Sequence, residues 1–428
     1  MGGFWHGIAM RLYRAGIGLA AAFGHAKARG WFAMREGRLE ALGVAKSRLK
    51  PGQQWMWFHC ASVGEYEQAR PVMEAWRSLH PGDALLLSFY SASGWDAFIR
   101  RHPEWWTPAD HATAMPLDVR TSMRSFVQAA GGAERLRGLL FTKYDVWPTL
   151  VAELTQLRVP VGLFAGHVLP GRWPFRWGGG YQRQAWKAMR RVWAQTEASL
   201  PTLSAYGVNA QVAGDPRFDR VLDAVGRHQP DQALKTWVNH RPCVVVGSAW
   251  QPEWDAAREA WQKGQCAIVV PHEWTAESTS AEASRWEARG ARTVVWSAHR
   301  GKDTRAELRE GDVLIVDVMG ELLDVYAVAD VAVVGGGFGN GVHNTLEPAA
   351  HGKRTLVGPE VGRFTEVAAL EATGGLSVCP SPSALREAIQ TALQNVEATR
   401  RAGAKAAAYA RENAGAGMAI AQGWSEAL

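Results

Sequence analysis

The sequence is poor in cysteine and has no long hydrophobic run. Four cysteines are scattered along 428 residues without a C-x-x-C pair, so neither a zinc site nor a disulfide framework is predicted, which fits a reducing compartment. The apolar run at residues 17–23 is about seven residues long, far short of the roughly 20 that a membrane-spanning helix needs. Arg11 and Arg14 before it and Ala26-Lys27-Ala28 after it also mimic a signal peptide, and that alternative stays open.

Several common motifs are absent as well. The chain has no low-complexity segment and no internal repeat. A glycine-rich segment around residue 335 has the spacing of neither a P-loop nor a G-x-G-x-x-G dinucleotide motif. No D-x-D run ends a predicted strand, so neither a bound metal ion nor another cofactor is expected.

Positive charge is concentrated at the N-terminus. The net charge is +6, and nine Lys or Arg residues stand against two Glu residues within the first 50 positions. Because the rest of the chain is close to neutral, we expect a local anionic partner and no nucleic acid. Aromatic residues are interleaved with these charges, as at an anionic bilayer surface: Phe4, Trp5, Tyr13, Phe23, Trp31 and Phe32. Residues 1–34 are therefore predicted to lie on a membrane; the alternative is a basic surface helix with a buried apolar stripe.

Short apolar runs alternate with amphipathic stretches along most of the chain. Strands are expected at 54–61, 84–90, 137–143 and 159–165, with helices between them and a further helix at 185–191. Turn formers at 214–217 mark a break, after which strands are expected at 243–247, 267–270, 293–296, 313–316, 331–334 and 354–357. An Ala-rich helical tail follows from 383 to 428. The pattern predicts an α/β protein of GT-B architecture, in which two Rossmann-like, doubly wound parallel-sheet domains (35–214 and 215–428) face a cleft.

The segment V-A-V-V-G-G-G-F-G-N-G-V-H-N-T-L-E-P (331–348) is the clearest candidate site. A strand that enters a glycine-rich loop and leaves as a helix start is typical of a phosphate site, because backbone N–H groups approach the anion there. Side chains added to this loop are expected to block the phosphate without disturbing the fold. One alternative is a tight turn that binds nothing. Another is that Asn344 and Glu347 form only a capping box.

Nine runs in order resemble the 3-deoxy-D-manno-octulosonic acid (Kdo) transferases of lipid A assembly, GT-B enzymes that use CMP-Kdo. They extend from R-E-G-R (35–38) to V-G-P-E-V-G-R-F-T-E (357–366) and include the glycine loop. The other runs are F-H-C-A-S-V-G-E (58–65), K-Y-D-V-W-P (143–148), G-D-P-R-F-D-R (214–220), V-G-S-A-W (246–250), V-P-H-E (270–273) and D-V-M-G-E-L-L-D-V-Y (317–326).

The resemblance implies a role for each matching residue. Glu36 is the expected general base, which takes the proton of the acceptor hydroxyl in an inverting, metal-independent transfer. The acceptor-side cleft residues are Ser62, Gly64, Glu65 and Lys143. The expected donor-binding residues are His272, Glu273, Gly335, Gly336, Gly337, Phe338, Gly339, Gly341, Asn344 and Glu347. The implied partners are CMP-Kdo, a lipid A precursor and the cytoplasmic face of the inner membrane.

Plainer interpretations remain for three of these positions. Glu36 can be a solvated charge between two arginines, Ser62 and Glu65 can form only a helix cap, and Lys143 can be an ordinary surface lysine. Asp145 also departs from the family, where Glu is common, as does the stretch 165–180. Alternative functions are a UDP-sugar enzyme of the same fold, such as a 2-epimerase or another glycosyltransferase, and a catalytically silent protein that binds a sugar nucleotide or a lipid.

Overall fold

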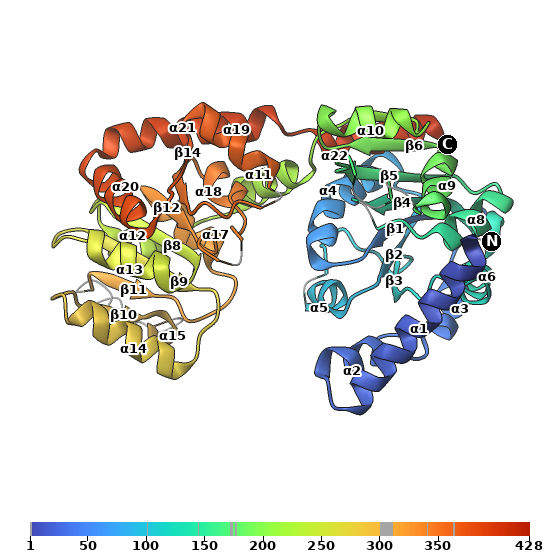
Figure 1. Ribbon diagram of the computed structural model, residues 1–428, viewed down its shortest axis with the longest axis horizontal. Helices are drawn as coiled ribbons and strands as arrows, with labels where there is room; N and C mark the ends of the chain where they lie inside the picture. Colours follow the sequence, from blue (N-terminus) through green and yellow to red (C-terminus); the bar gives the residue numbers. More distant parts are fainter. Residues whose placement is uncertain are drawn as a thin grey trace. The chain divides into compact units, whose positions relative to one another are not determined.

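The computed structural model describes residues 2–428 except 101, 144, 172–173, 176–177, 300–310, 340 and 363. The chain forms two compact units, one made of residues 1–220 and Ala414–Leu428, and the other of Val221–Asn413. Each unit is built on its own sheet of seven described strands, and neighbouring strands in both sheets are parallel (Figure 1). The prediction of two Rossmann-like parallel-sheet domains is confirmed.

The first unit has the strand order β3-β2-β1-β4-β5-β6-β7. Its strands are β1 (Trp55–Cys60), β2 (Ala84–Phe89), β3 (His111–Ala114), β4 (Leu136–Thr142), β5 (Val161–Gly166), β6 (Arg191–Ala194) and β7 (Ala210–Val212). All six residues of β1 and of β2 are buried. Strands covered on both faces must be apolar along their whole length, which is why the sequence shows continuous hydrophobic runs here.

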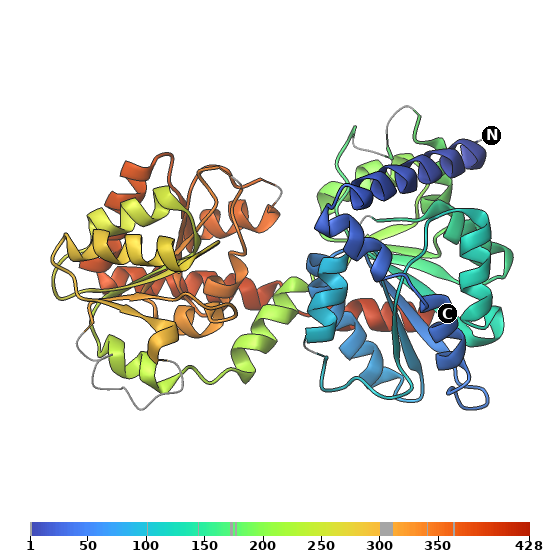
Figure 2. The same cartoon turned by 90° about the horizontal axis from the view of Figure 1, so that it is seen from below.

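Helices cover both faces of this sheet. Buried side chains of α3 (Arg38–Lys46), α6 (Arg120–Ala129), α8 (Pro148–Gln156) and α9 (Gly180–Ala188) pack in one core cluster. Those of α4 (Val63–Leu79), α5 (Ala92–Arg100) and α22 (Ala416–Ala427) pack in the other. Two N-terminal helices, α1 (Gly2–Ala22) and α2 (Ala26–Ala33), lie along one side of the unit (Figure 2). The remaining short elements are α7 (Gly132–Arg135), η1 (Glu197–Ser199) and α10 (Leu200–Ala205).

The second unit has the order β10-β11-β9-β8-β12-β13-β14. Its strands are β8 (Cys243–Ala249), β9 (Cys266–Pro271), β10 (Thr293–Val295), β11 (Val313–Ile315), β12 (Val331–Val334), β13 (Arg354–Val357) and β14 (Leu376–Val378). Its helices are α12 (Gln232–Val238), α13 (Gln251–Ala260), α14 (Ala276–Glu287), α15 (Trp296–His299), α17 (Leu322–Val328), α18 (Leu346–Ala350), α19 (Thr365–Thr373), α20 (Pro382–Gln394) and α21 (Val396–Glu412). The glycine loop thus follows β12, next to the central strand β8.

The chain divides differently from the predicted 35–214 and 215–428. Along the chain, the boundary between the units follows Arg220, within α11 (Arg217–Arg227). The last helix belongs to the first unit. In α22, Ile420, Ala421 and Trp424 are fully buried against that unit. A Cβ on Gly138 or Gly162 would come within 2.8 or 2.9 Å of the Trp424 ring, so these two glycines make room for the indole. The tail is therefore divided between the two units.

Two local predictions were also wrong or incomplete. The helix expected at 185–191 is α9, which ends at Ala188, and Arg191 begins the buried strand β6. The three-residue strands β7 and β14 were not predicted, because runs this short carry no readable period. Among the helices that the structure describes, none is both long and apolar enough to cross a bilayer.

Candidate functional sites at the ends of the two sheets

Three non-glycine residues near the carboxyl ends of strands have left-handed backbone conformations. They are Lys143 after β4 (φ 67°), Ala165 in β5 (φ 54°) and Ser248 in β8 (φ 50°). Such conformations cost on the order of 1–3 kcal/mol each and cluster at functional sites. Because ligands of parallel sheets bind outside the carboxyl ends of strands, these positions indicate one site in each unit.

In the second unit, the glycine loop uses several of its N–H groups internally. The amide of Gly335 donates to the carbonyl of Gly247 at 2.9 Å, and that of Gly336 donates to Oε1 of Glu253 at 3.0 Å. The amide of Gly339 donates back to Gly336 at 3.2 Å. These amides do not face a phosphate, which corrects the expectation that the whole loop presents free N–H groups.

The first three glycines are required for close backbone packing. A Cβ on Gly335 would lie 2.3 Å from the carbonyl oxygen of Ser248, and one on Gly337 would lie 2.5 Å from the amide of Gly358. Gly336 has φ +89°, and its Cβ would lie 2.3 Å from the carbonyl oxygen of Gly341. A Cβ on Gly339 would meet nothing within 4 Å. The loop therefore combines a rigid base with an open tip.

Glu253, which the sequence analysis missed, is the residue that organises this loop. Its side chain is 1% exposed and accepts hydrogen bonds from the amides of Gly336 and Trp250. Burial raises the pKa of this carboxyl, and the backbone donors oppose that shift. The only hint in the sequence is a glutamate at the third position of a helix start, which is usually read as a cap.

Three aromatic rings stack beside the loop. The rings of Trp250 and His272 lie 4.8 Å apart between centroids, and those of His272 and His343 are stacked at 4.5 Å. Burial, and then the proximity of His272, lower the pKa of His343, so its imidazole is neutral at pH 7. Trp250 Nε1 and His343 Nε2 are buried and have no hydrogen-bond partner among the described residues. The site thus offers stacked rings and unused polar atoms to a planar ligand.

The other predicted donor residues surround this stack. His272 and Glu273 are exposed directly after β9, and Asn344 precedes the short helix α18. The Asn344 amide donates to Oε1 of Glu347 at 3.0 Å, while its Oδ1 accepts from the amide of Leu346 at 3.1 Å. Asn344 and Glu347 therefore bond to each other, and the reciprocal capping box considered as an alternative does not form.

In the first unit, Glu36 lies in the turn between α2 and α3 and is exposed. Its neighbour Arg35 fixes this turn with three hydrogen bonds of 2.8 Å, which it donates to the carbonyls of Trp31, Tyr90 and Met115. Burial lowers the pKa of Arg35 to about 10, so the guanidinium stays charged at pH 7. Gly37, with φ +65°, completes the turn. The arrangement anchors Arg35 and leaves the Glu36 carboxylate in solvent.

Glu65 and Lys143 belong to a polar cluster at the ends of β1 and β4. Burial and the charge of Asp145 raise the pKa of Glu65 to about 8, while the Ala61 amide and Lys143 oppose the shift. Glu65 accepts a hydrogen bond from the amide of Ala61. Ser62 begins α4 without a side-chain cap, so the predicted two-sided cap is not formed. Gly64 is exposed in the first turn of the same helix.

His59, in β1, also belongs to this cluster. Its Nδ1 lies 2.9 Å from Ser88 Oγ, and that hydroxyl already accepts a hydrogen bond from Trp57 Nε1 at 2.7 Å. The hydroxyl proton is then best directed at Nδ1, which puts the imidazole proton on Nε2, 3.8 Å from Asp145 Oδ2.

Trp147 donates from Nε1 to the same oxygen of Asp145 at 3.1 Å. The shorter carboxylate at position 145 therefore accepts one ring N–H hydrogen bond, and His59 Nε2 lies beyond hydrogen-bond distance. Part of the second departure from the family pattern, residues 172–173 and 176–177, lies outside the described residues.

Glu65 is expected to make stability fall as the pH rises. Because its folded pKa of about 8 exceeds the ordinary 4.5, the folded state binds more protons than the unfolded chain between these values. The stabilising contribution is fully present below about pH 4.5 and is lost as the pH rises through about 8. Glu65→Gln should flatten this fall in urea titrations from pH 5 to 8, whereas Glu40→Gln, an exposed control, should not. An unchanged slope in Glu65→Gln would contradict this assignment.

Comparison with known proteins agrees with these motifs. The family model described as "3-Deoxy-D-manno-octulosonic-acid transferase (kdotransferase)" matches residues 35–220. A 3-deoxy-D-manno-octulosonic acid transferase of Bordetella pertussis is 30% identical over 85% of this chain and 84% of its own length. The chain belongs to the Kdo transferase family. The enzyme is therefore a glycosyltransferase, as the sequence predicted. A Haemophilus influenzae relative of the same name is 22% identical over 89% of each chain.

Solved structures support the fold of this transferase. UDP-GlcNAc 2-epimerase from Neisseria meningitidis matches with a TM-score of 0.57 and 10% identity, over 88% of this chain and 99% of that one. Anabaena HepE in complex with UDP matches with a TM-score of 0.56 and 12% identity, over 87% and 98%. At such low identity these matches concern the fold alone, and they confirm the GT-B architecture.

Proposed function

We propose that the enzyme moves Kdo from CMP-Kdo to a hydroxyl of a lipid A precursor, with inversion and without a metal ion. The observation that carries this proposal is the 30% identical relative, a Kdo transferase matched over 85% of this chain. Mass spectrometry of a lipid A precursor incubated with CMP-Kdo and EDTA tests the reaction. A gain of one or more Kdo units supports it. Turnover of a UDP-sugar without acceptor would instead indicate the 2-epimerase alternative.

Glu36 is the proposed general base. The acceptor oxygen forms a bond to the anomeric carbon of Kdo while the bond from that carbon to the phosphate oxygen of CMP breaks. The electron pair leaves with CMP, and the hydroxyl proton passes to the Glu36 carboxylate. The anchored Arg35 next to it supports this role, because it fixes the turn through three backbone carbonyls and not through the Glu36 carboxylate. One positioned carboxylate is enough for a single displacement.

The ring stack and the open tip of the glycine loop are the proposed donor site. A pyrimidine base can stack on or beside Trp250, His272 and His343, and their unused N–H and N atoms can bond to its edge. Asn344 before α18 is the group proposed for the phosphate, and the open tip at Gly339 leaves room for it; Phe338 and Glu347 lie nearby in sequence, and Glu273 directly follows His272. In the first unit, Ser62, Glu65 and Lys143 are the proposed acceptor-side residues.

Helix α1 is the proposed membrane contact. One side docks on the first unit, where His6 Nε2 lies 2.8 Å from Asp118 Oδ2 and where Met10 and Ile17 pack against Trp31. The opposite side exposes large apolar residues, namely Phe4, Trp5, Leu12, Leu19 and, just past the helix, Phe23. An apolar helix face beside Arg11 and Arg14 is the composition of an interfacial helix. It supports peripheral association with the cytoplasmic face of the inner membrane.

The charged residues of this segment should be measurable in vesicle binding. Replacing Arg11, Arg14, Lys27 and Arg29 by Ser should weaken binding to anionic vesicles by a few kcal/mol, at about 1 kcal/mol per basic residue near the surface. Added salt should weaken wild-type binding as well. A matched control replaces four exposed basic residues of α21: Arg400, Arg401, Lys405 and Arg411. Equal losses in both variants, or no loss in either, would contradict this placement of the membrane contact.

A further inference from the structure

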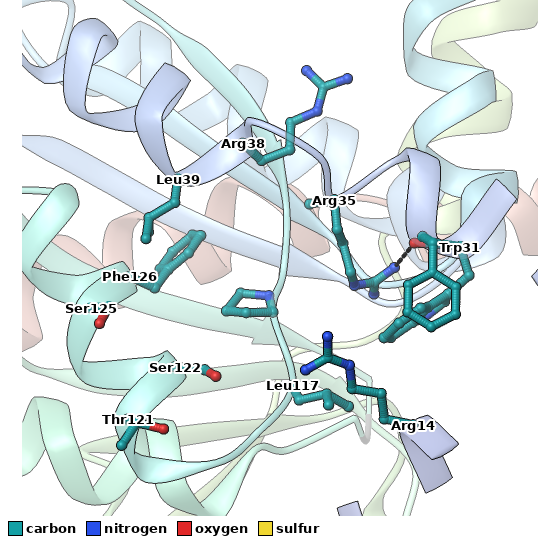
Figure 3. A pocket seen from close by; sticks show the side chains of 13 residues that line it. Arg14, Trp31, Arg35, Arg38, Leu39, Leu117, Thr121, Ser122, Ser125 and Phe126 are labelled. Carbon is teal, nitrogen blue, oxygen red and sulfur yellow. Dashed lines mark hydrogen bonds between the residues drawn. The ribbon is translucent and has the colours of Figure 1, made fainter. Parts of the chain in front are cut away.

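A pocket of about 440 Å³ lies in the first unit beside the anchored turn, and none of its residues belongs to the polar cluster at the ends of β1 and β4. Its walls come from α1, from α2 and the start of α3 with the turn between them, from the end of β3 and the loop after it, and from α6 (Figure 3). Three arginines line it, together with three hydroxyl side chains and a set of apolar ones, and no Asp or Glu is among the lining residues. Such a lining selects against cations and for an anion.

The three arginines differ in the hydrogen bonds and ring contacts that they already make within the protein. Arg35 donates hydrogen bonds to three backbone carbonyls and contributes a fixed positive charge. Arg38 donates from Nε to Met34 and stacks on Trp95 at 4.3 Å. Arg14 has no hydrogen-bond or ion-pair partner among the described residues, and its guanidinium points into the same space as that of Arg35 (Figure 3). Two facing guanidinium groups without a carboxylate are costly unless an anion joins them.

The rest of the lining is divided by polarity. The hydroxyls of Thr121, Ser122 and Ser125 line the wall that α6 contributes, and Ser122 points towards the pocket (Figure 3). The rings of Trp31, Phe32 and Phe126 and the side chain of Leu117 supply an apolar wall. A small inorganic anion would leave these apolar side chains in contact with water. A phosphate with an acyl chain attached would use both parts, the head against the arginines and hydroxyls and the chain against the rings.

We propose that this pocket binds the anionic, phosphate-bearing end of the acylated acceptor. The inference rests on the proposed function and adds a seat for its lipid substrate. Arg35 and Arg38 flank the proposed base, Glu36, in sequence, and Arg14 lies on α1 beside the exposed apolar face. A lipid that arrives from the surface on which α1 lies would place its head next to the turn that carries Glu36. A bulk phospholipid has the same head chemistry and is distinguished below.

Binding is measured first, without a bilayer and without donor. The probe is dihexanoyl phosphatidic acid below its micelle concentration, titrated calorimetrically into the full chain. Arg14→Gln removes a positive charge from the pocket, and Ser122→Phe fills part of its volume. Each variant should weaken binding of the probe at least tenfold. The matched controls are Arg120→Gln and Gln128→Phe, both on α6, exposed and outside the lining. They should stay within about twofold of wild type.

Two binding results would overturn the proposal. Equal weakening by Arg120→Gln and Arg14→Gln would mean diffuse surface electrostatics. If inorganic phosphate binds as tightly as the lipid probe, the pocket does not bind the acyl chain. Arg14 is exposed, so its variant keeps the test decisive if Ser122→Phe fails to fold by circular dichroism.

Transfer kinetics then distinguish the acceptor from a bulk phospholipid. In detergent, Arg14→Gln should raise the acceptor KM at least tenfold and leave the CMP-Kdo KM unchanged. An unchanged acceptor KM, with weaker vesicle binding, would assign the pocket to bilayer phospholipid and contradict the proposal. If wild-type protein transfers no Kdo, the proposed function fails, and the probe titration still decides whether the pocket binds a phosphorylated lipid.

Discussion

Glu36→Gln is expected to reduce Kdo transfer by about 10²- to 10⁴-fold, the usual contribution of a general base. Glutamine keeps the shape of the side chain but cannot take the acceptor proton. The three hydrogen bonds of Arg35 hold the turn in place, so the fold should be unchanged. CMP affinity should barely change, because the proposed donor site is built entirely from the second unit. Steady-state transfer rates and calorimetric CMP binding measure the two effects separately.

The matched control is Glu40→Gln. Glu40 is also exposed and lies four residues further on, in the first turn of α3. Glu40→Gln removes the same negative charge near the same turn. A purely electrostatic effect on acceptor binding would therefore appear in both variants. If Glu36→Gln retains transfer within about threefold of wild type, Glu36 is not the base. Glu65 would be the next carboxylate to test; because its pKa of about 8 leaves it mostly protonated at pH 7, transfer that uses it as the base should increase as the pH rises through 8.

Gly336→Val should destabilise the second unit by about 2–6 kcal/mol, the sum of left-handed strain and overpacking. The reason is steric, because its Cβ would lie 2.3 Å from the carbonyl oxygen of Gly341 at φ +89°. The hydrogen bond from Gly336 to Glu253 would be lost as well. The expectation that the fold tolerates side chains in the loop is therefore corrected at this position. Urea unfolding with a tryptophan signal measures the loss.

Gly339→Val adds the same side chain to the open tip and serves as the matched variant. Nothing lies within 4 Å of its Cβ, so the free energy of unfolding should stay close to that of wild type. If the tip contacts the donor phosphate, the Kd for CMP should rise at least tenfold, which is about 1.4 kcal/mol. Equal destabilisation by both variants would refute the packing argument. Unchanged CMP affinity in Gly339→Val would remove the tip from the donor site.

Both sheets could be predicted because their strands are buried on two faces. Runs such as 55–58 and Val331–Val334 are apolar at every position, and few other structures require that. The motif residues then fell at the carboxyl ends of strands by topology alone. The last helix could not be assigned to its unit, because the contact of Trp424 with Gly138 and Gly162 joins residues more than 250 positions apart. Sequence periodicity shows that a helix has an apolar face but not which sheet it covers.

The candidate sites were predictable as segments, and their hydrogen bonding was not. The glycine pattern correctly indicated a close approach of backbones, but the approach at Gly335–Gly337 is to the protein itself. Glu253 was missed because a buried carboxylate and a helix cap look alike in sequence. Arg35 was read as a neighbouring charge, whereas its three carbonyl partners come from segments up to 80 residues away. Such partners depend on tertiary structure, which no local motif encodes.

The most direct test of the proposed reaction is the stoichiometry of nucleotide release and lipid glycosylation by the purified enzyme. With CMP-Kdo, a lipid A precursor and EDTA, the proposal predicts one CMP released for each Kdo found on the lipid, and little CMP when the acceptor is omitted. Chromatography of the nucleotide and mass spectrometry of the lipid give both numbers from one reaction. CMP release without lipid product, or turnover of a UDP-sugar with none from CMP-Kdo, would contradict it.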